Sequence, residues 1–395
     1  MQTVRTDEAG LATAARVLTS GGIAVIPTDT VYGLAAHPGF PAAVERLYEI
    51  KHRAAKKPIA LLASDAEGAA KFLGGMDAQA TRIAKKHWPG ALTLVLPKGE
   101  AFEGLRVPDH DWTRRLLSAC GGVLRVTSAN LSGQRAAIDA PEALAAIGLS
   151  ADLVVDDGIS PGGVASTVAK VANGEITILR QGPVQFLTLA SGSPRRAKIL
   201  REHAVDFTIV KSDAPEVCYP NDPERTVREN ALAKGKLVSL GPRGRGPYDV
   251  GCTVRAAPSR PDDVLSADTI VWFNNKIYGK PRDLAEAKQF LRELSGQVHT
   301  VFTGVAYDGD VKICRSDVRF RVLTDAMIDE YVARVKPTDR AGAYDIDESG
   351  DYIVEGYTGS YENIMGLPVE PLKEWHIVDA TAKGDAAFLP RESKW

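Results

Sequence analysis

The sequence contains few cysteines and no long apolar segment. Its four cysteines are scattered through 395 residues without a CxxC pair, so neither a zinc site nor a disulfide framework is indicated. No apolar run approaches the roughly 20 residues that span a bilayer. Residues 1–8 also lack the charged-then-apolar layout of a signal peptide. We therefore expect a reduced, cytoplasmic protein with no membrane association.

The sequence also lacks an excess of either charge. The formal net charge is −2, with 19 Lys and Arg against 18 Asp and Glu in residues 1–184 and 29 against 32 in the remainder. A domain that binds nucleic acid usually carries a clear basic footprint. We therefore expect no stable nucleic-acid binding, although this balance leaves room for a local basic patch.

Helix-like and strand-like patterns alternate along both halves of the chain, and its length suggests more than one domain. The pattern breaks at 181–183, and we found no internal repeat. The fold class predicted is α/β, with two different α/β domains in tandem at 1–184 and 185–376 and a polar C-terminal tail at 377–395. Residues 241–263, rich in Gly, Pro and Arg, are expected to form an exposed insertion.

Hydrophobic periodicity gives the expected elements. Helices are predicted at 7–20, 41–51, 65–73, 77–87, 193–204, 223–238, 283–294 and 325–335. Strands are predicted at 22–27, 58–63, 91–97, 122–126, 152–156, 164–171, 175–180, 186–190, 206–210 and 267–273, and within 297–323.

Several polar motifs in the first half follow predicted strands or helices. The segment PTDTVYGL at 27–34 directly follows a strand, where open α/β sheets bind ligands. Lys51 and Arg53 stand two apart at a helix end, where both can reach one polyanion. Taken singly, each motif is more simply interpreted as an ordinary turn or helix cap. Together and in this order they favour an anion-binding site.

These motifs resemble the YrdC-type threonylcarbamoyl-AMP synthase family over about residues 10–182. The resemblance rests on PTDTVYGL, the K-x-R element, WPGALTLVLP, RVPDH, SANLSG, and STV before a final Arg. It implies a YrdC-like twisted open sheet that converts L-threonine, bicarbonate and ATP to threonylcarbamoyl-AMP and pyrophosphate. That product leads to N6-threonylcarbamoyladenosine in tRNA, so tRNA-modification proteins are candidate partners.

The same resemblance implies roles for individual residues. Lys51, Arg53, Thr93, Ser128, Asn130 and Arg180 would bind ATP, whereas Thr28, Thr30, Arg106 and Ser166 would bind threonine. The chain departs from the family pattern in a shorter segment before Arg106 and in Val126-Thr127, where the family commonly has Ala-Pro. The shorter segment is expected to change the shape of the threonine pocket.

The second half begins with a polar turn, SGSPRR at 191–196, between a strand and a helix. A helix N-terminus offers free backbone N–H groups to an anion, and two arginines add bidentate donors. No Walker A loop is present. The simpler reading is an N-capped helix with an exposed basic first turn. Because arginine is poorly matched to the positive end of a helix, the turn favours an anion site.

With its companion motifs, this turn resembles the Maf family of nucleoside triphosphate pyrophosphatases over about residues 186–375. The companions are SADTIV, GKP, SGQVHTVFTG, DRAGAY and GSYENIMGLP. The resemblance implies a Maf/ITPase-like fold that hydrolyses nucleoside triphosphates, either dTTP and UTP or modified nucleotides, to monophosphate and pyrophosphate. It also implies a divalent cation, Mg²⁺ or Mn²⁺.

In this resemblance Asp268 is the catalytic general base, and Glu216 and Asp268 bind the metal. The triphosphate-binding residues are Ser191, Ser193, Arg195, Arg196, Lys234 and Lys280, and base specificity falls on Arg195, Thr269 and Asp347. The pyrimidine-preferring branch typically has Gly-Ile-Gln where this chain has Asp-Ile-Asp at 345–347. A carboxylate accepts hydrogen bonds but cannot donate them, so the preferred base stays open.

A different class of function must be weighed against two activities. The chain could be an RNA-binding or scaffold protein in which one or both domains are catalytically inert. Pyrophosphate release from ATP with threonine and bicarbonate separates this alternative from an enzyme, because RNA retention without turnover would instead fall steeply with salt.

Overall fold

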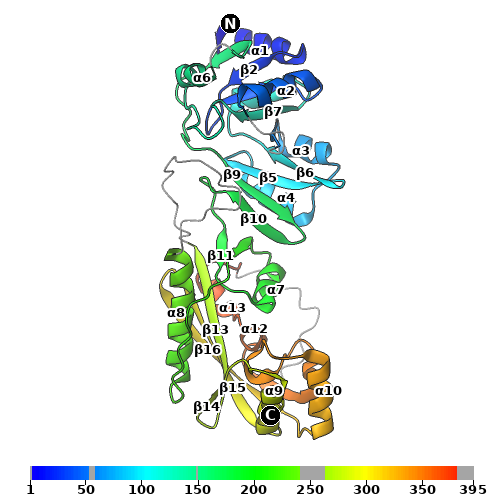
Figure 1. Ribbon diagram of the computed structural model, residues 1–395, viewed down its shortest axis with the longest axis vertical. Coiled ribbons are helices and arrows are strands. Elements are labelled where there is room, and N and C mark those ends of the chain that lie inside the picture. Colours follow the sequence, from blue (N-terminus) through cyan, green and yellow to red (C-terminus); the bar gives the residue numbers. More distant parts are fainter. Residues whose placement is uncertain (1, 53–57, 148–149, 241–262, 380–395) are drawn as a thin grey trace. The chain divides into compact units, whose positions relative to one another are not determined.

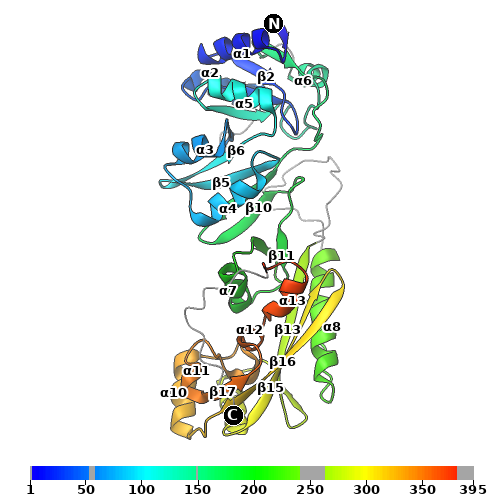
Figure 2. The same ribbon diagram turned by 180° about the vertical axis from the view of Figure 1, so that it is seen from behind.

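The computed structural model describes residues 2–52, 58–147, 150–240 and 263–379. Among these residues, contacts define two compact units, one ending at Gln185 and the other beginning at Phe186. Each unit combines helices with its own sheet (Figures 1 and 2), which confirms the predicted α/β class. Arg53, residues 241–262 of the predicted insertion at 241–263 and residues 380–395 of the predicted tail at 377–395 lie outside the described residues.

The first unit is built on a ten-stranded mixed sheet, ordered β1-β8-β2-β3-β7-β4-β6-β5-β9-β10. Its strands are β1 Gln2–Arg5, β2 Ile23–Ile26, β3 Gly33–Ala36, β4 Leu61–Ala63, β5 Leu92–Lys98, β6 Ala101–Arg106, β7 Val123–Ser128, β8 Leu153–Asp156, β9 Thr167–Ala172 and β10 Glu175–Arg180. Its helices are α1 Glu8–Thr19, α2 Pro41–Ile50, α3 Ala66–Leu73, α4 Ala78–His87, α5 Asp111–Ala119 and α6 Ala140–Ile147.

Strand β2 shows why this sheet is covered on both faces. Successive side chains of a strand point to opposite sides, and every residue of β2 is buried. Ile23 and Val25 pack in a cluster with residues of α2 and α6. Ala24 and Ile26 pack in a second cluster with residues of α1 and α5. The continuous apolar run in the sequence therefore reflects a central strand between two helical layers.

The second unit contains a seven-stranded sheet ordered β12-β11-β13-β15-β16-β17, with β14 paired to β13. Its strands are β11 Leu187–Leu189, β12 Phe207–Ile209, β13 Val264–Phe273, β14 Lys276–Tyr278, β15 Val298–Tyr307, β16 Asp310–Phe320 and β17 Val354–Thr358. Its helices are α7 Pro194–Glu202, α8 Pro223–Leu240, α9 Leu284–Leu294, α10 Asp325–Val335, the 3₁₀ turn η2 Ala341–Ala343, α11 Gly350–Ile353, α12 Tyr361–Met365 and α13 Val369–Glu374.

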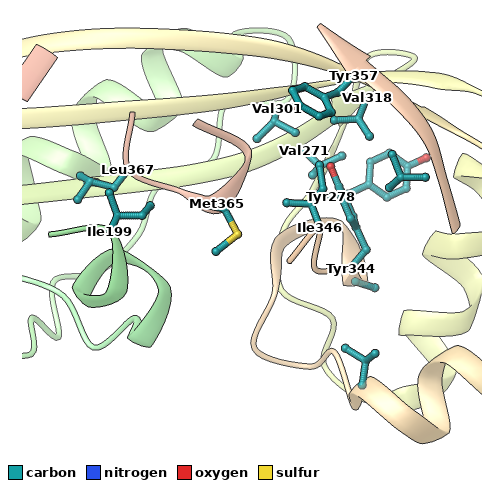
Figure 3. Packing of buried hydrophobic residues seen from close by; sticks show 14 of the residues in the cluster. Ile199, Val271, Tyr278, Val301, Val318, Tyr344, Ile346, Tyr357, Met365 and Leu367 are labelled. Atoms are coloured by element: carbon teal, nitrogen blue, oxygen red, sulfur yellow. The ribbon is translucent and has the colours of Figure 1, made fainter. Parts of the chain in front are cut away.

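The main core of this unit packs on the sheet face opposite α8. Figure 3 shows Val271, Val301 and Val318 from three adjacent strands above Ile346, and Leu367 beside Ile199 of α7. On the other face, α8 lies close to β15 because position 304 is glycine: a Cβ there would lie 2.5 Å from the carbonyl oxygen of Val227. The sheet thus separates a large core from a thinner layer beneath α8.

Long periodic segments were predicted correctly, whereas some short strands, such as β1, β3 and β6, were missed. Strand β3 has the sequence GLAA, which carries no β-branched residue, and it forms by antiparallel pairing with β2. Residues 27–32 therefore follow β2 directly, as expected, and form the turn of a β2–β3 hairpin. Val378 is also buried in the core of the second unit, so this unit extends beyond the predicted boundary at 376.

Candidate functional sites

Lys51 lies in the first unit directly after α2, and only 2% of it is exposed. Its Nζ donates to the backbone oxygen of Asn130 at 2.5 Å and to the Oδ1 of Asn130 at 3.1 Å. It also donates to the backbone oxygen of Ser128, whose Oγ lies 3.5 Å away. A buried ammonium requires such acceptors because desolvation is costly. The structure therefore brings Lys51, Ser128 and Asn130 together.

A second cluster surrounds Arg106 at the end of β6. Its guanidinium donates to the Oγ1 of Thr30 at 2.8 Å and to the carbonyl of Gly90 at 2.8 Å, and it pairs with Asp29. The Oγ1 atoms of Thr28 and Thr30 lie 3.1 Å apart. Burial lowers the pKa of Arg106, and the Asp29 carboxylate opposes that shift. The turn of the β2–β3 hairpin and the end of β6 thus form one polar cluster.

The third cluster joins Thr93, Ser166 and Arg180. The parallel β5–β9 pair places Thr93 opposite Val168, and the Oγ atoms of Thr93 and Ser166 are 2.9 Å apart. Arg180 donates twice to the carbonyl of Ser166, at 2.7 and 3.0 Å, and once to its Oγ at 3.1 Å. Thr93 lies on β5, and β5 pairs with β6, which ends at Arg106. The cluster around Ser166 is therefore next to the cluster around Arg106 in the sheet.

In the second unit, no strand of the described residues pairs with one edge of β13 along the predicted catalytic segment at 266–270. Strand β11 pairs with β13 only at 264–265, and β14 pairs with it at 271–273. Between these two short strands, β13 is paired along its other edge by β15. Side chains from both faces of 266–270 can therefore reach this edge.

The two faces of β13 carry different chemistry. Ser266 and Asp268 face α8, where the Oγ of Ser266 donates to the carbonyl of Ala231 at 2.7 Å. Thr269 points to the opposite face, where its Oγ1 accepts from Arg196 at 3.1 Å. This alternation follows directly from the period of a strand. The predicted base and the predicted specificity residue are thus adjacent in sequence but belong to different hydrogen-bond networks.

Lys234 of α8 lies between the two predicted metal ligands. Its Nζ is 2.6 Å from the Oδ1 of Asp268 and 2.7 Å from the Oε1 of Glu216. Asn230 donates to the other oxygen of Asp268 at 3.0 Å. Because residues four apart share a helix face, Asn230 and Lys234 together hold Asp268. Asn230 was not identified from the sequence. Its position four residues before Lys234 on the predicted helix was the signal that could have identified it.

The surroundings keep Glu216 ionised. Burial alone raises its pKa, but the hydrogen bond and charge of Lys234, together with the charges of Lys280 and Arg196, bring the pKa below its ordinary value. Lys280 therefore contributes to the same electrostatic site as Glu216. Two carboxylates and several cations meet at this edge of the sheet.

Arg196 is 9% exposed and held by three neutral acceptors. It donates to the carbonyl of Gly366 at 2.8 Å, the Oγ of Ser191 at 3.0 Å and the Oγ1 of Thr269. Burial lowers the pKa of Arg196 to about 10, while the charges of Asp268 and Glu216 act in the opposite direction. The side chain therefore stays protonated at neutral pH.

A buried relay supports this orientation. Thr303 donates to the carbonyl of Asn363 at 3.1 Å, so its Oγ1 is left to accept from Thr269, 3.1 Å away. Thr269 in turn accepts from Arg196. A hydroxyl donates only one hydrogen, so while Thr303 donates to Asn363 it can only accept from Thr269. Thr303 was not identified from the sequence, where it is one of many strand threonines.

Of the remaining predicted residues, Arg195 and Asp347 lie in ion pairs and Ser193 lies in a hydrogen-bonded turn. Arg195 donates to the buried Asp345 at 2.9 Å, and Arg340 donates to the same oxygen at 2.9 Å. Asp347 pairs with Lys198 at 2.5 Å and accepts from the Tyr361 hydroxyl at 3.1 Å. The Ser193 amide donates to the Oγ of Ser191 at 3.2 Å. Asp345 was known as a departure from the family pattern, but its partnership with two arginines was not foreseen.

Comparison with known proteins agrees with the geometry of the second unit. Residues 186–375 match the family described as Maf-like protein. A dTTP/UTP pyrophosphatase of Desulfitobacterium hafniense is 39% identical over 214 residues, covering 52% of this chain and 91% of that protein. One from Thermosipho melanesiensis is 36% identical over 196 residues, covering 49% and 96%. The chain belongs to the Maf-like family.

The Maf-like region is preceded by a second recognised region. Residues 16–182 match the Sua5/YciO/YrdC family, described as telomere recombination, which confirms the proposed tandem. Among solved structures, P. abyssi Sua5 complexed with L-threonine is 26% identical with a TM-score of 0.45, covering 52% of this chain and 62% of that chain. This chain therefore spans less than two thirds of that neighbour.

Within the described residues, no helix is long and apolar enough to cross a membrane.

Proposed function

We propose that the chain is a bifunctional enzyme with a separate reaction in each unit. Residues 1–184 convert L-threonine, bicarbonate and ATP to threonylcarbamoyl-AMP and pyrophosphate for tRNA N6-threonylcarbamoyladenosine synthesis. Residues from 185 to at least 378 hydrolyse nucleoside triphosphates, with dTTP, UTP and modified nucleotides as candidate substrates. The main support for this proposal is that each unit holds buried Lys or Arg side chains beside polar residues of the predicted motifs.

In the first unit, the chemistry requires stabilisation of anions and not an activated nucleophile. Lys51, held beside Ser128 and Asn130, is proposed to contact the ATP phosphates, together with Arg180 and Arg53. Arg106, fixed by Thr30 and Gly90, is proposed to bind threonine and its carbamate. Preorganised donors of this kind stabilise developing charge without reorganising during the reaction.

In the second unit, Asp268 is proposed to accept the proton of the attacking water as pyrophosphate leaves. Arg195, Arg196, Lys234 and Lys280 are proposed to bind the triphosphate. Arg196 is already oriented by neutral acceptors, so it can bind an added anion without losing a carboxylate partner. Phosphoryl transfer depends mainly on positioning and charge neutralisation, which this set of residues can provide.

The donors in the second unit fit a divalent cation. Glu216 and Asp268 each direct one carboxylate oxygen toward the same ammonium group, and carboxylate oxygens are suitable ligands for Mg²⁺ or Mn²⁺. When bound, such a cation would neutralise phosphate charge and orient the leaving group. We propose Glu216 and Asp268 as the residues that hold it.

Pyrophosphate release tests both reactions on the same preparation. ATP with threonine and bicarbonate should release pyrophosphate through the first unit, and omission of threonine should abolish that signal. A panel of nucleoside triphosphates without threonine reports on the second unit. If neither condition gives turnover while RNA is retained in a salt-dependent manner, the inert RNA-binding alternative is correct.

A further inference from the structure

The position of Lys234 raises the question of how a metal ion reaches the two carboxylates. Its ammonium contacts one oxygen of Asp268 at 2.6 Å and one oxygen of Glu216 at 2.7 Å. A divalent cation that bridged these two oxygens would need the same point in space. Exchange of the ammonium for a divalent ion would place one more positive charge between the two carboxylates, beside the charges of Lys280 and Arg196 that already act on Glu216.

The second oxygen of Asp268 already has a hydrogen-bond partner. It accepts a hydrogen bond from the Nδ2 of Asn230 at 3.0 Å. Asn230 is itself anchored at both ends of its amide, because it accepts from the Val217 amide at 2.8 Å and donates to the Val217 carbonyl at 3.0 Å. Of the two groups on Asp268, Lys234 is the one on a long flexible stem.

The same contacts show what would keep Glu216 and Asp268 close together when the Lys234 ammonium moves away. Val217 follows Glu216 directly in the chain, and Asn230 links its backbone to α8 and to Asp268. The Oγ of Ser212 also donates to the backbone carbonyl of Lys234 at 3.1 Å, a contact that does not involve the ammonium. The two carboxylates therefore stay close together without the lysine side chain.

We propose that the Lys234 ammonium is an exchangeable counter-ion that occupies the metal position until a nucleotide arrives. A triphosphate offers the ammonium a new anionic partner, so the lysine moves to the phosphates as the cation takes its place between Glu216 and Asp268. Metal and nucleotide then bind together, and the nucleotide-free protein binds free metal weakly. The inference rests on the proposed function for the identity of the anion that draws Lys234 away.

Direct binding of Mn²⁺ in the absence of nucleotide tests this inference. Free Mn²⁺ is measured by electron paramagnetic resonance in titrations of the full chain and of Lys234→Met. Because the variant lacks the competing charge-assisted hydrogen bonds, we expect it to bind Mn²⁺ about tenfold more tightly than the original protein. Equal or weaker binding by Lys234→Met would overturn the inference.

Three further variants separate the effect of the direct contact between Lys234 and the two carboxylates from the effect of positive charge in general. Lys280→Met removes a charge that acts on Glu216, and Lys198→Met removes a charge paired with Asp347. Both should raise Mn²⁺ affinity much less than Lys234→Met does, and an equal rise would refute the counter-ion role. Lys234→Arg retains a cation on α8 and should retain weak Mn²⁺ binding.

Folding must be followed in the same samples, since Lys234→Met removes the ammonium that lies between the Glu216 and Asp268 carboxylates. If this variant folds only when Mn²⁺ is added, the Mn²⁺ dependence of its folding supports the inference. If it does not fold at any Mn²⁺ concentration, the inference fails, because a cation that fits this position would replace the ammonium. None of these titrations contains substrate, so they are independent of the turnover assays that test the proposed function.

Discussion

The buried lysines of the two candidate sites have different partners. In the first unit, Lys51 donates to uncharged oxygens of Ser128 and Asn130. In the second unit, Lys234 lies between two carboxylates and Arg195 is paired with a third. Lys51 is oriented by uncharged oxygens, whereas Lys234 must leave a carboxylate when it binds an added anion. The contrast is between these two lysines and not between the whole sites, because Arg106 of the first unit pairs with Asp29 and Arg196 of the second unit is held by neutral acceptors.

The largest effect is expected for Asp268→Asn in the second unit. An amide cannot accept the proton of water, so we expect triphosphate hydrolysis to fall about 1,000-fold. Threonine-dependent release of pyrophosphate from ATP should be unchanged, because that reaction is assigned to the other unit. Loss of both activities would contradict two independent sites.

A smaller but substantial effect is expected for Lys51→Met in the first unit. Loss of one preorganised cationic donor should lower kcat/KM for ATP by about 100-fold, with no change in triphosphate hydrolysis by the second unit. Arg46→Met is the matched control, since Arg46 forms an exposed ion pair with Asp152 in the same unit and such pairs contribute little. If the two variants behave alike, the role assigned to Lys51 is wrong.

The stability of the second unit should depend on pH through His299. Burial lowers the pKa of His299 from 6.5 to about 3, so the unfolded chain binds a proton below pH 6.5 that the folded chain does not. Stability should therefore fall as the pH decreases from 6.5 toward 3, by about 1.4 kcal/mol per pH unit for this group.

Urea unfolding of the full chain, followed through the transition of the second unit, measures this slope. In His299→Gln the slope attributable to this group should disappear, although the variant will be less stable overall because His299 bonds the Tyr344 hydroxyl at 3.0 Å. An unchanged slope would show that His299 is not the responsible group.

The smallest effect is expected for Thr303→Val, which interrupts the relay behind Arg196. Without Thr303 as acceptor, the Thr269 hydroxyl must donate elsewhere, and the Gly366 carbonyl that also holds Arg196 lies 3.5 Å away. We expect KM for the triphosphate to rise about fivefold, in line with one lost neutral hydrogen bond, with kcat nearly unchanged. Thr303→Ser should restore KM, and a purely structural role would not produce this split.

Prediction from sequence succeeded where a pattern is long or a motif is dense. The helix predicted at 223–238 is present as α8, and the turn at 191–196 does open α7. Strands such as β3 were missed because their short Gly and Ala sequences acquire strand geometry only through their neighbours. Asn230 and Thr303 were missed because a single polar residue on a helix or strand has no distinctive local signal.

The sequence by itself determined the α/β class, the two family motif sets and the side chains available to each site, because periodicity and motif order are local properties of the chain. Only the tertiary structure decided which charges meet. Lys234 reaches both Glu216 and Asp268, and Asp345 binds both Arg195 and Arg340, through contacts between segments distant in sequence. The electrostatic state of each group depends on these partners and on burial, which are products of the fold.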